Sequence, residues 1–194
     1  IITGVLSGTD TKYAEEILKA GGADYMDMFS FHPYVYPNSP EKGNFKAQLE
    51  EMKALFNKYT KKDIHFWLTE LGWSSCENDL GVTEEQKADY LLRTLQIVNE
   101  LDYVDYMMQY ETHMSGNKYF LENNWGALGA PTDRINQYAA NQVFIGYGAF
   151  NNLLAGYKYA GAEQLSQSVF VRKYTNAAAK KNMWILWTDD TEAN

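Results

Sequence analysis

The chain has 194 residues, which suits one domain of ordinary size, and 45% of them are hydrophobic, a fraction that excludes a disordered protein. Its formal net charge of −8 at pH 7, without a basic cluster, makes nucleic acid and anionic membrane surfaces poor partners. The lone cysteine, Cys76, excludes an internal disulfide and a cysteine-type zinc site, and no apolar run reaches the roughly 20 residues of a membrane span.

Strands and helices are predicted to alternate along most of the chain. A β-prone run over residues 1–6 leads into a helix that Thr9 or Asp10 can cap and that Gly21-Gly22 can end. Further along, the patterns predict strands over 25–34, 63–73 and 104–110, and helices over 44–59, from 83 through 101 and over about 134–154. Thr83 and Gln86 have the spacing of a capping box, which opens the second of these helices.

This order implies an α/β fold with parallel strands and right-handed crossovers. Four strand–helix units in about 155 residues fit the second half, strands five to eight, of a (β/α)₈ TIM barrel, because a whole barrel needs roughly 250 residues. They also fit a small open sheet. No GxGxxG or GxxxxGK[ST] motif follows a strand, which counts against nucleotide binding, and no cofactor is expected.

The composition changes after Gly161. Residues 168–176 and 181–189 are β-prone, are separated by the sequence NAAAK and show no helical period. They predict a hairpin that starts an all-β sandwich domain. The expected organisation is therefore a half-barrel over 1–160 and a partial β-sandwich accessory domain over 161–194.

Polar and aromatic side chains gather where three predicted strands end. Glu70 is near the end of one strand, His32 and Tyr34 of another, and Tyr110 and Glu111 of the third. Ligands of parallel α/β folds bind at the carboxyl ends of the strands. A glutamate at such a place is more often a helix cap or an ion-pair partner, but the apolar neighbours of Glu70 would penalise an idle charge. The convergence favours a functional site.

Several of these segments together resemble a known family. They are SFHPY (30–34), LTELGWSS (68–75), VTEEQKADYLLR (82–93) and NNWGALG (123–129). They look like the second half of a clan A glycoside hydrolase, a group of retaining (β/α)₈-barrel glycosidases, with the closest likeness to the β-xylosidase-like and cellulase-like families. The resemblance covers roughly residues 1–160 and implies a hydrolase that acts on a β-linked oligo- or polysaccharide.

The resemblance also implies roles for individual residues. Glu70 matches the nucleophile, and Tyr34 matches a tyrosine that donates a hydrogen bond to it. Four residues match substrate-contacting positions: His32, Trp73, Tyr110 and Trp125. At Tyr110 the family usually has tryptophan. The family's acid/base is an Asn-Glu pair on the fourth strand; Asn99-Glu100 is predicted to end a helix and is not equivalent. The chain is therefore expected to carry only the nucleophile half of an active site, and to be inactive alone.

Two other functions stay open at this point. One is a non-catalytic carbohydrate-binding fragment that keeps the aromatic residues without the chemistry. The other is a metal-dependent hydrolase using His32, Glu70 and His113, although neither HxH nor HExxH occurs; no metal site is our expectation.

The partner and the location of the protein are expectations as well. Four strands of a barrel leave two free edges, and the inner sides of the strands, to which we assign Phe29, Phe31, Phe66 and Leu68, would be uncovered. The expected partner is a missing N-terminal half-barrel or a second copy of the chain. No charged leader precedes Ile1, which looks like a cut, and a secreted or extracellular location is expected.

Overall fold

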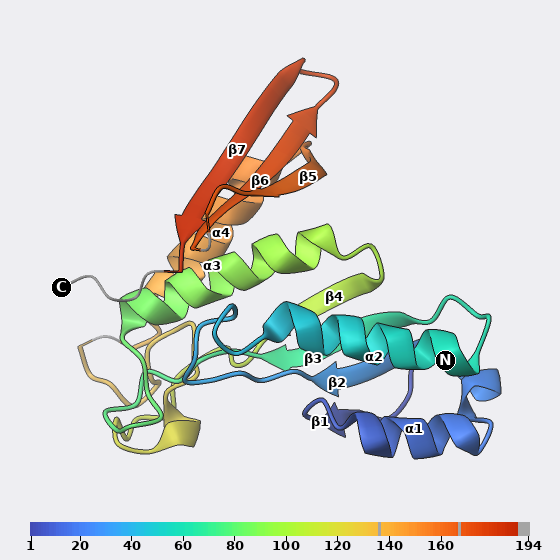
Figure 1. The fold of residues 1–194 in the computed structure, drawn as a ribbon. Helices are drawn as coiled ribbons and strands as arrows, with labels where there is room; N and C mark the ends of the chain where they lie inside the picture. The colour runs from blue at the N-terminus through green and yellow to red at the C-terminus, as the bar shows by residue number, and fades with distance from the viewer. Residues whose placement is uncertain (136, 167, 190–194) are drawn as a thin grey trace.

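A computed structural model describes residues 1–135, 137–166 and 168–189, and these residues form two sheets (Figure 1). The first is parallel, with the strand order β1-β2-β3-β4, and the second is antiparallel, with the order β5-β6-β7. Strands β1 to β4 are Leu6–Ser7, Met28–His32, His65–Leu71 and Val104–Gln109. The predicted α/β class and the parallel strands are confirmed.

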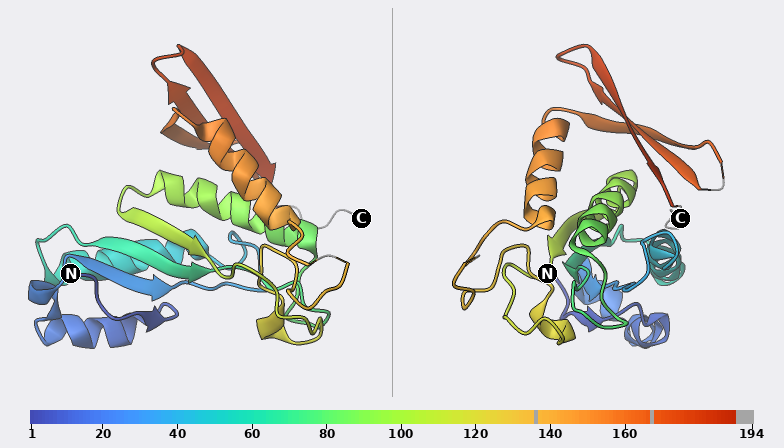
Figure 2. Two further views of the ribbon diagram at one scale, coloured as in Figure 1. Left: turned by 180° about the vertical axis from the view of Figure 1, so that it is seen from behind. Right: turned by 90° about the vertical axis from the view of Figure 1, so that its left-hand side faces the viewer.

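Helices join the parallel strands and lie together on one side of their sheet, as the right-hand view of Figure 2 shows. They are α1 (Thr11–Lys19), the 3-10 turn η1 (Gly22–Tyr25), α2 (Phe45–Tyr59) and α3 (Glu84–Glu100). The Asp10 side chain caps α1 by accepting from the Lys12 and Tyr13 amides, and both hydrogen bonds of the Thr83–Gln86 capping box are present. These helix starts agree with the sequence prediction.

The main core lies between α2 and the parallel sheet. The ring centroids of Phe29 and Phe66 lie 4.8 and 5.5 Å from that of Phe56 on α2. Phe31 and Leu68 are fully buried in the same cluster. The prediction that Phe29, Phe31, Phe66 and Leu68 face an uncovered barrel centre is therefore wrong. Because side chains alternate along a strand, the opposite face carries their sequence neighbours, among them Trp67.

The first strand and helix α4 have boundaries that differ from the prediction. The first strand is only Leu6–Ser7, preceded by an isolated bridge from Ile2 to Met28, since Gly4 interrupts the β-prone run. Helix α4 begins at Gln142 instead of about 134. The segment before it is drawn into backbone pairing, with hydrogen bonds from Gly129 to Ala139 and from Asn141 to Ala127. Residue 136 of the predicted helix lies outside the described residues.

The antiparallel sheet has a strand that the sequence did not reveal. Strand β5 (Lys158–Gln164) precedes the two predicted ones, β6 (Val169–Asn176) and β7 (Lys181–Thr188). Its sequence KYAGAEQ lacks a strand pattern, and a bulge between Tyr159 and Gly161 breaks its alternation. Residues 190–194 of the predicted β-sandwich domain lie outside the described residues, and so does residue 167.

The antiparallel sheet packs on α3 through polar contacts, and α4 (Gln142–Leu154) lies beside it (Figure 1). The Tyr174 hydroxyl donates to Gln96 at 2.7 Å, and Arg172 pairs with Glu100 at 2.6 Å. Arg93 on α3 donates to the Thr188 carbonyl at 2.9 Å. Within the described parts of the chain, no helix has the length and apolar character needed to cross a membrane.

Candidate functional site

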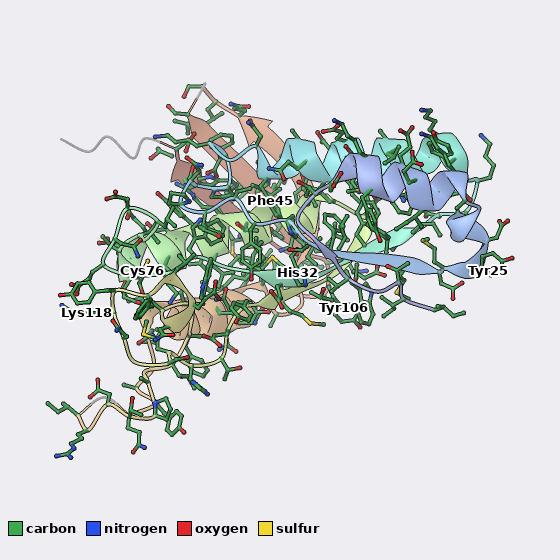
Figure 3. The ribbon with its side chains drawn as sticks, turned by 90° about the horizontal axis from the view of Figure 1, so that it is seen from below. Tyr25, His32, Phe45, Cys76, Tyr106 and Lys118 are labelled. Carbon is green, nitrogen blue, oxygen red and sulfur yellow. The ribbon has the colours of Figure 1, made fainter. Side chains whose placement is uncertain are left out.

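The loops that follow the parallel strands gather at one end of the sheet. In Figure 3, His32 lies toward this end, Cys76 and Lys118 lie among the loops, and Tyr25 marks the opposite end. His32 is the last residue of β2, Glu70 is the penultimate residue of β3, and Tyr110 follows β4 directly. The three strand ends that the sequence pointed to are therefore neighbours in the fold.

Glu70 is the centre of a short hydrogen-bonded chain. Its Oε2 accepts from the Tyr34 hydroxyl at 3.1 Å and lies 3.2 Å from His32 Nδ1. The other ring nitrogen, His32 Nε2, lies 3.1 Å from the Thr69 hydroxyl oxygen. A neutral imidazole with its proton on Nδ1 satisfies both contacts, because Nε2 then accepts from Thr69. The expected Tyr34–Glu70 contact is present.

The side chains of this hydrogen-bonded group differ in their exposure to solvent. The Glu70 side chain is 37% exposed, whereas that of His32 is only 13% exposed. Burial, and next the negative charge of Glu70, raise the pKa of Tyr34 well above its ordinary range, so its hydroxyl keeps its proton and remains a donor. The Glu70 carboxylate thus faces solvent on one side and the Tyr34 and His32 donors on the other. This arrangement holds the carboxylate in one orientation.

An aromatic cluster stands beside Glu70. The Trp125 ring centroid lies 5.3 Å from that of Tyr34, 4.8 Å from that of Tyr36 and 6.0 Å from that of Tyr110. Trp125 itself is only 2% exposed. Its indole N–H has no hydrogen-bond partner among the described residues. Trp125 therefore lies behind the tyrosines, which offer more surface to a ligand.

Trp73 does not belong to this surface. It is fully buried in the core and its indole N–H donates to the Asn38 carbonyl at 2.8 Å. Its ring packs on Tyr90 of α3. We correct the expectation of a substrate contact here: Trp73 supports the loop after β2 from inside, because both its apolar ring and its one donor are already occupied.

Glu111, the other carboxyl group near a strand end, faces a different space. It lines a small cavity of about 200 Å³ together with Gln109, Val143 and Tyr147. Burial raises its pKa. Its Oε1 is buried and has no hydrogen-bond partner among the described residues. The cavity lies toward α4, so Glu111 is not a member of the Glu70 cluster.

A larger cavity among the described residues is also separate from Glu70. It has a volume of about 1080 Å³ and lies between the loop after β3 and the long loop after β4. Polar residues, among them Ser75, Asn78, Thr83 and Asn141, make up much of its lining, and Glu70 is absent from it. The volume therefore does not identify the functional site, and the hydrogen-bonded groups around Glu70 do so more directly.

Two members of the site escaped the sequence prediction. Tyr36 joins the aromatic cluster, and its spacing of two residues from Tyr34 in YVYP was the available signal. Lys87 on α3 is only 1% exposed and donates to the carbonyls of Asn124 and Gly126, on either side of Trp125. A lysine within TEEQKAD resembles a solvated helix residue, so no sequence signal identified it.

A metal site receives no support from the described residues, which contain no group of three or more His, Cys, Asp or Glu side chains that could hold an ion. His32 does contact Glu70. His113 instead lies 3.0 Å from the Met114 carbonyl oxygen and packs on Tyr138. The three proposed ligands are therefore not brought together.

Comparisons with known proteins find similarity in solved structures. A family-model search and a search of curated proteins find no match. The β-glucuronidase of Lactobacillus rhamnosus matches with a TM-score of 0.52 and 20% identity, over 78% of this chain and 26% of that one. A Ruminococcus gnavus β-glucuronidase, in complex with C6-substituted uronic isofagomine, matches with a TM-score of 0.51 and 13% identity, over 77% and 25%.

A third structure is an endo-β-1,3-glucanase from Amycolatopsis mediterranei in complex with laminarihexaose. It matches with a TM-score of 0.52 and 13% identity, over 76% of this chain and 57% of that one. The chain thus spans about a quarter of the length of the glucuronidases and 57% of the glucanase. At these identities the similarity concerns the fold: this chain resembles part of several glycoside hydrolases.

Proposed function

We propose that this chain is the second half of a retaining (β/α)₈-barrel glycoside hydrolase of clan A, with Glu70 as the nucleophile. The observation that carries the proposal is the Glu70 cluster: a partly exposed carboxylate at a strand end, oriented by Tyr34 and His32 and flanked by Tyr110 and Trp125. The partial fold similarity to three glycoside hydrolases supports it.

The proposed chemistry assigns one task to each group. Glu70 attacks the anomeric carbon, the bond to the leaving oxygen breaks, and a covalent glycosyl-enzyme forms that water later hydrolyses. Tyr34 and His32 aim the attacking oxygen, and the Tyr34 hydroxyl keeps its proton throughout. Tyr110 offers its ring as a platform for the sugar, since aromatic faces pack on the C–H groups of sugar rings. The segments of the chain at this end of the sheet would thus form one wall of the glycone site.

Retaining chemistry needs a second carboxyl group about 5–5.5 Å from the first, as acid and then base. The hydrogen-bond and ion-pair partners of Glu70 within the described residues are Tyr34 and His32, and neither carries a carboxyl group. We assign the acid/base to the other half of the barrel, because the family that the sequence resembles carries it on the fourth strand. Without such a half, the alternative function, a non-catalytic carbohydrate-binding fragment, is favoured.

The sheet offers a surface that another half-barrel would cover. Strands β1 and β4 are its edges among the described residues. On the face away from α2, Trp67 packs on Tyr106 with ring centroids 4.5 Å apart, and Tyr106 is 56% exposed. The proposed partner is the N-terminal half of the barrel or a second copy of the chain, and the proposed location remains extracellular. Light scattering tests the partner: a well-folded monomer at high concentration would contradict it.

The substitution Glu70→Gln tests the proposed function. In a complete barrel containing this chain, it should abolish hydrolysis of a panel of aryl β-D-glycosides (glucoside, xyloside and glucuronide) while circular dichroism and the melting temperature stay unchanged. The matched control is Glu77→Gln, a carboxyl group of the following loop that pairs with Lys118. Activity of Glu70→Gln within a few-fold of wild type would reject the assignment. The 194-residue chain alone should not hydrolyse any member of the panel, because the proposal places the second carboxyl group in the other half of the barrel.

A further inference from the structure

Lys87 is a buried amine that the proposed chemistry does not use. It lies in the first turns of α3, and its side chain is 1% exposed. Its Nζ donates to the Asn124 carbonyl at 2.9 Å and to the Gly126 carbonyl at 2.8 Å. The same ammonium lies 3.7 Å from a Glu84 carboxylate oxygen. Lys87 thus links the helix after β3 to the long loop after β4.

Both carbonyls flank Trp125, and the indole has no hydrogen bond of its own among the described residues. The carbonyl of Trp125 accepts a hydrogen bond of 3.3 Å from Gln109. Hydrogen bonds along this short segment and ring packing therefore fix the indole. The ring in turn lies 5.3 Å from Tyr34, whose hydroxyl contacts Glu70. A shift of the backbone around Trp125 would therefore move the indole against Tyr34, and Tyr34 contacts Glu70 directly.

We propose that Lys87 is a positioning residue of the candidate site, which holds the backbone on both sides of Trp125 and so sets the indole against Tyr34. The consequence for sugar binding rests on the function proposed above, whereas the placement of Trp125 does not. Asn124 and Gly126 also accept from Ser75 and Asn141. Loss of Lys87 should therefore shift the segment without unfolding it.

The two hydrogen bonds from Lys87 to the Asn124 and Gly126 carbonyls, which we call the clamp, should respond to pH. Burial lowers the pKa of Lys87 to about 8, against the opposing effect of Glu84 on the same helix and of Glu111 after β4. Above that pH the ammonium becomes a neutral amine, which donates weaker hydrogen bonds to the two carbonyls. The chemical environment of the Trp125 indole should therefore change with the protonation state of Lys87. A residue with only a general structural role would not produce such a pH dependence.

Fluorine NMR of the 194-residue chain labelled with 5-fluorotryptophan tests the proposal, because the chain has 5 tryptophans and Trp125→Phe assigns the resonance of interest. Wild type should show a Trp125 titration near pH 8. Lys87→Met should move the resonance at pH 7 and abolish the titration. Lys87→Arg should restore the pH 7 position without restoring the titration.

The matched control is Lys53→Met. Lys53 also donates to a backbone carbonyl, that of Ile64 at 2.8 Å, but it lies near the start of β3, at the opposite end of the sheet. It should leave Trp125 unchanged even if it lowers the melting temperature. A Trp125 resonance that is the same in Lys87→Met and wild type at all pH values would overturn the proposal.

Calorimetry of a complete barrel containing this chain, with laminarihexaose, the β-linked glucan oligosaccharide of the glucanase complex, as the ligand, separates the clamp from the function. Lys87→Met and Trp125→Phe should each bind about tenfold more weakly than wild type, the equivalent of one lost hydrogen bond or ring contact. Lys53→Met should bind as wild type does. If Lys87→Met moves Trp125 but neither laminarihexaose nor the glycosides of the panel bind to wild type, the clamp is supported and the proposed function is overturned.

Discussion

The stability of the chain should depend on pH through Lys87 in a direction opposite to that of an ion-paired lysine, whose pKa is raised in the folded state. Lys87 has a pKa of about 8 in the folded chain, against 10.5 for its ordinary value, because burial disfavours the charged form. The unfolded chain therefore binds more protons between these two values, and the free energy of unfolding rises with pH in that window. Below pH 8 the full penalty applies, and above pH 10.5 it has vanished.

The size of this effect follows from the shift. The difference between the two pKa values corresponds to roughly 3 kcal/mol, of which about 2 kcal/mol is recovered between pH 7 and pH 9.5. The side chain is only 1% exposed, so solvent screening does not reduce this value much. In Lys87→Met the contribution disappears, while the Asn124 carbonyl keeps its hydrogen bonds from Ser75 and the Gly126 carbonyl keeps that from Asn141. The variant should therefore fold at pH 7 with stability close to or above that of wild type.

Urea denaturation of wild type and Lys87→Met, at pH 7 and at pH 9.5, measures the effect. The difference between the two proteins cancels the titrations that they share. We expect wild type to gain about 2 kcal/mol relative to the variant, with equal m-values. A difference that does not change with pH, or that changes in favour of the variant, would refute the argument that the buried amine titrates near pH 8.

Three further substitutions test other contacts. Tyr34→Phe removes the 3.1 Å hydrogen bond to Glu70, and kcat/KM of a complete barrel should fall by roughly 10–100-fold; unchanged kinetics would contradict the pairing. Arg93→Met leaves the Glu41 carboxylate, 8% exposed, without its cation, and urea denaturation should report a loss of about 3–5 kcal/mol; a neutral result would mean that the pair is not buried in solution. Trp73→Phe removes the hydrogen bond to the Asn38 carbonyl and should cost about 1–3 kcal/mol in the same assay, with a smaller loss contradicting the core assignment.

The sequence predicted those helix starts and helices that depend on interactions between residues close together in the chain. The Asp10 cap, the capping box at Thr83 and the apolar spacing of α2 depend on residues a few positions apart, so the sequence contained the whole signal. Strand β5 and the start of α4 depend on pairing with distant segments. Leu128 forms bridges to His113 and to Ala140, and no local pattern around residue 134 reveals this.

The candidate site was predictable as far as strand ends determine it. Parallel strands place His32, Glu70 and Tyr110 on one rim, and the resemblance to a family suggested the Tyr34 contact. Side-chain direction was less predictable. Trp73, two residues beyond the end of β3, turns into the core, and the inward and outward faces of the strands were assigned the wrong way round. Which face of a sheet the helices cover is a tertiary property, since both faces of these strands carry aromatic residues.

Covalent trapping of Glu70 is the most direct test of the central claim. A 2-deoxy-2-fluoro-β-glycosyl fluoride of the sugar preferred in the aryl glycoside panel should slow the second step of a retaining enzyme and leave the sugar on the nucleophile. Peptide mass spectrometry of a complete barrel containing this chain should then find the label on Glu70, and Glu70→Gln should remain unlabelled. A label on another carboxyl group of a turning-over enzyme, with Glu111 as the first alternative, would contradict the account.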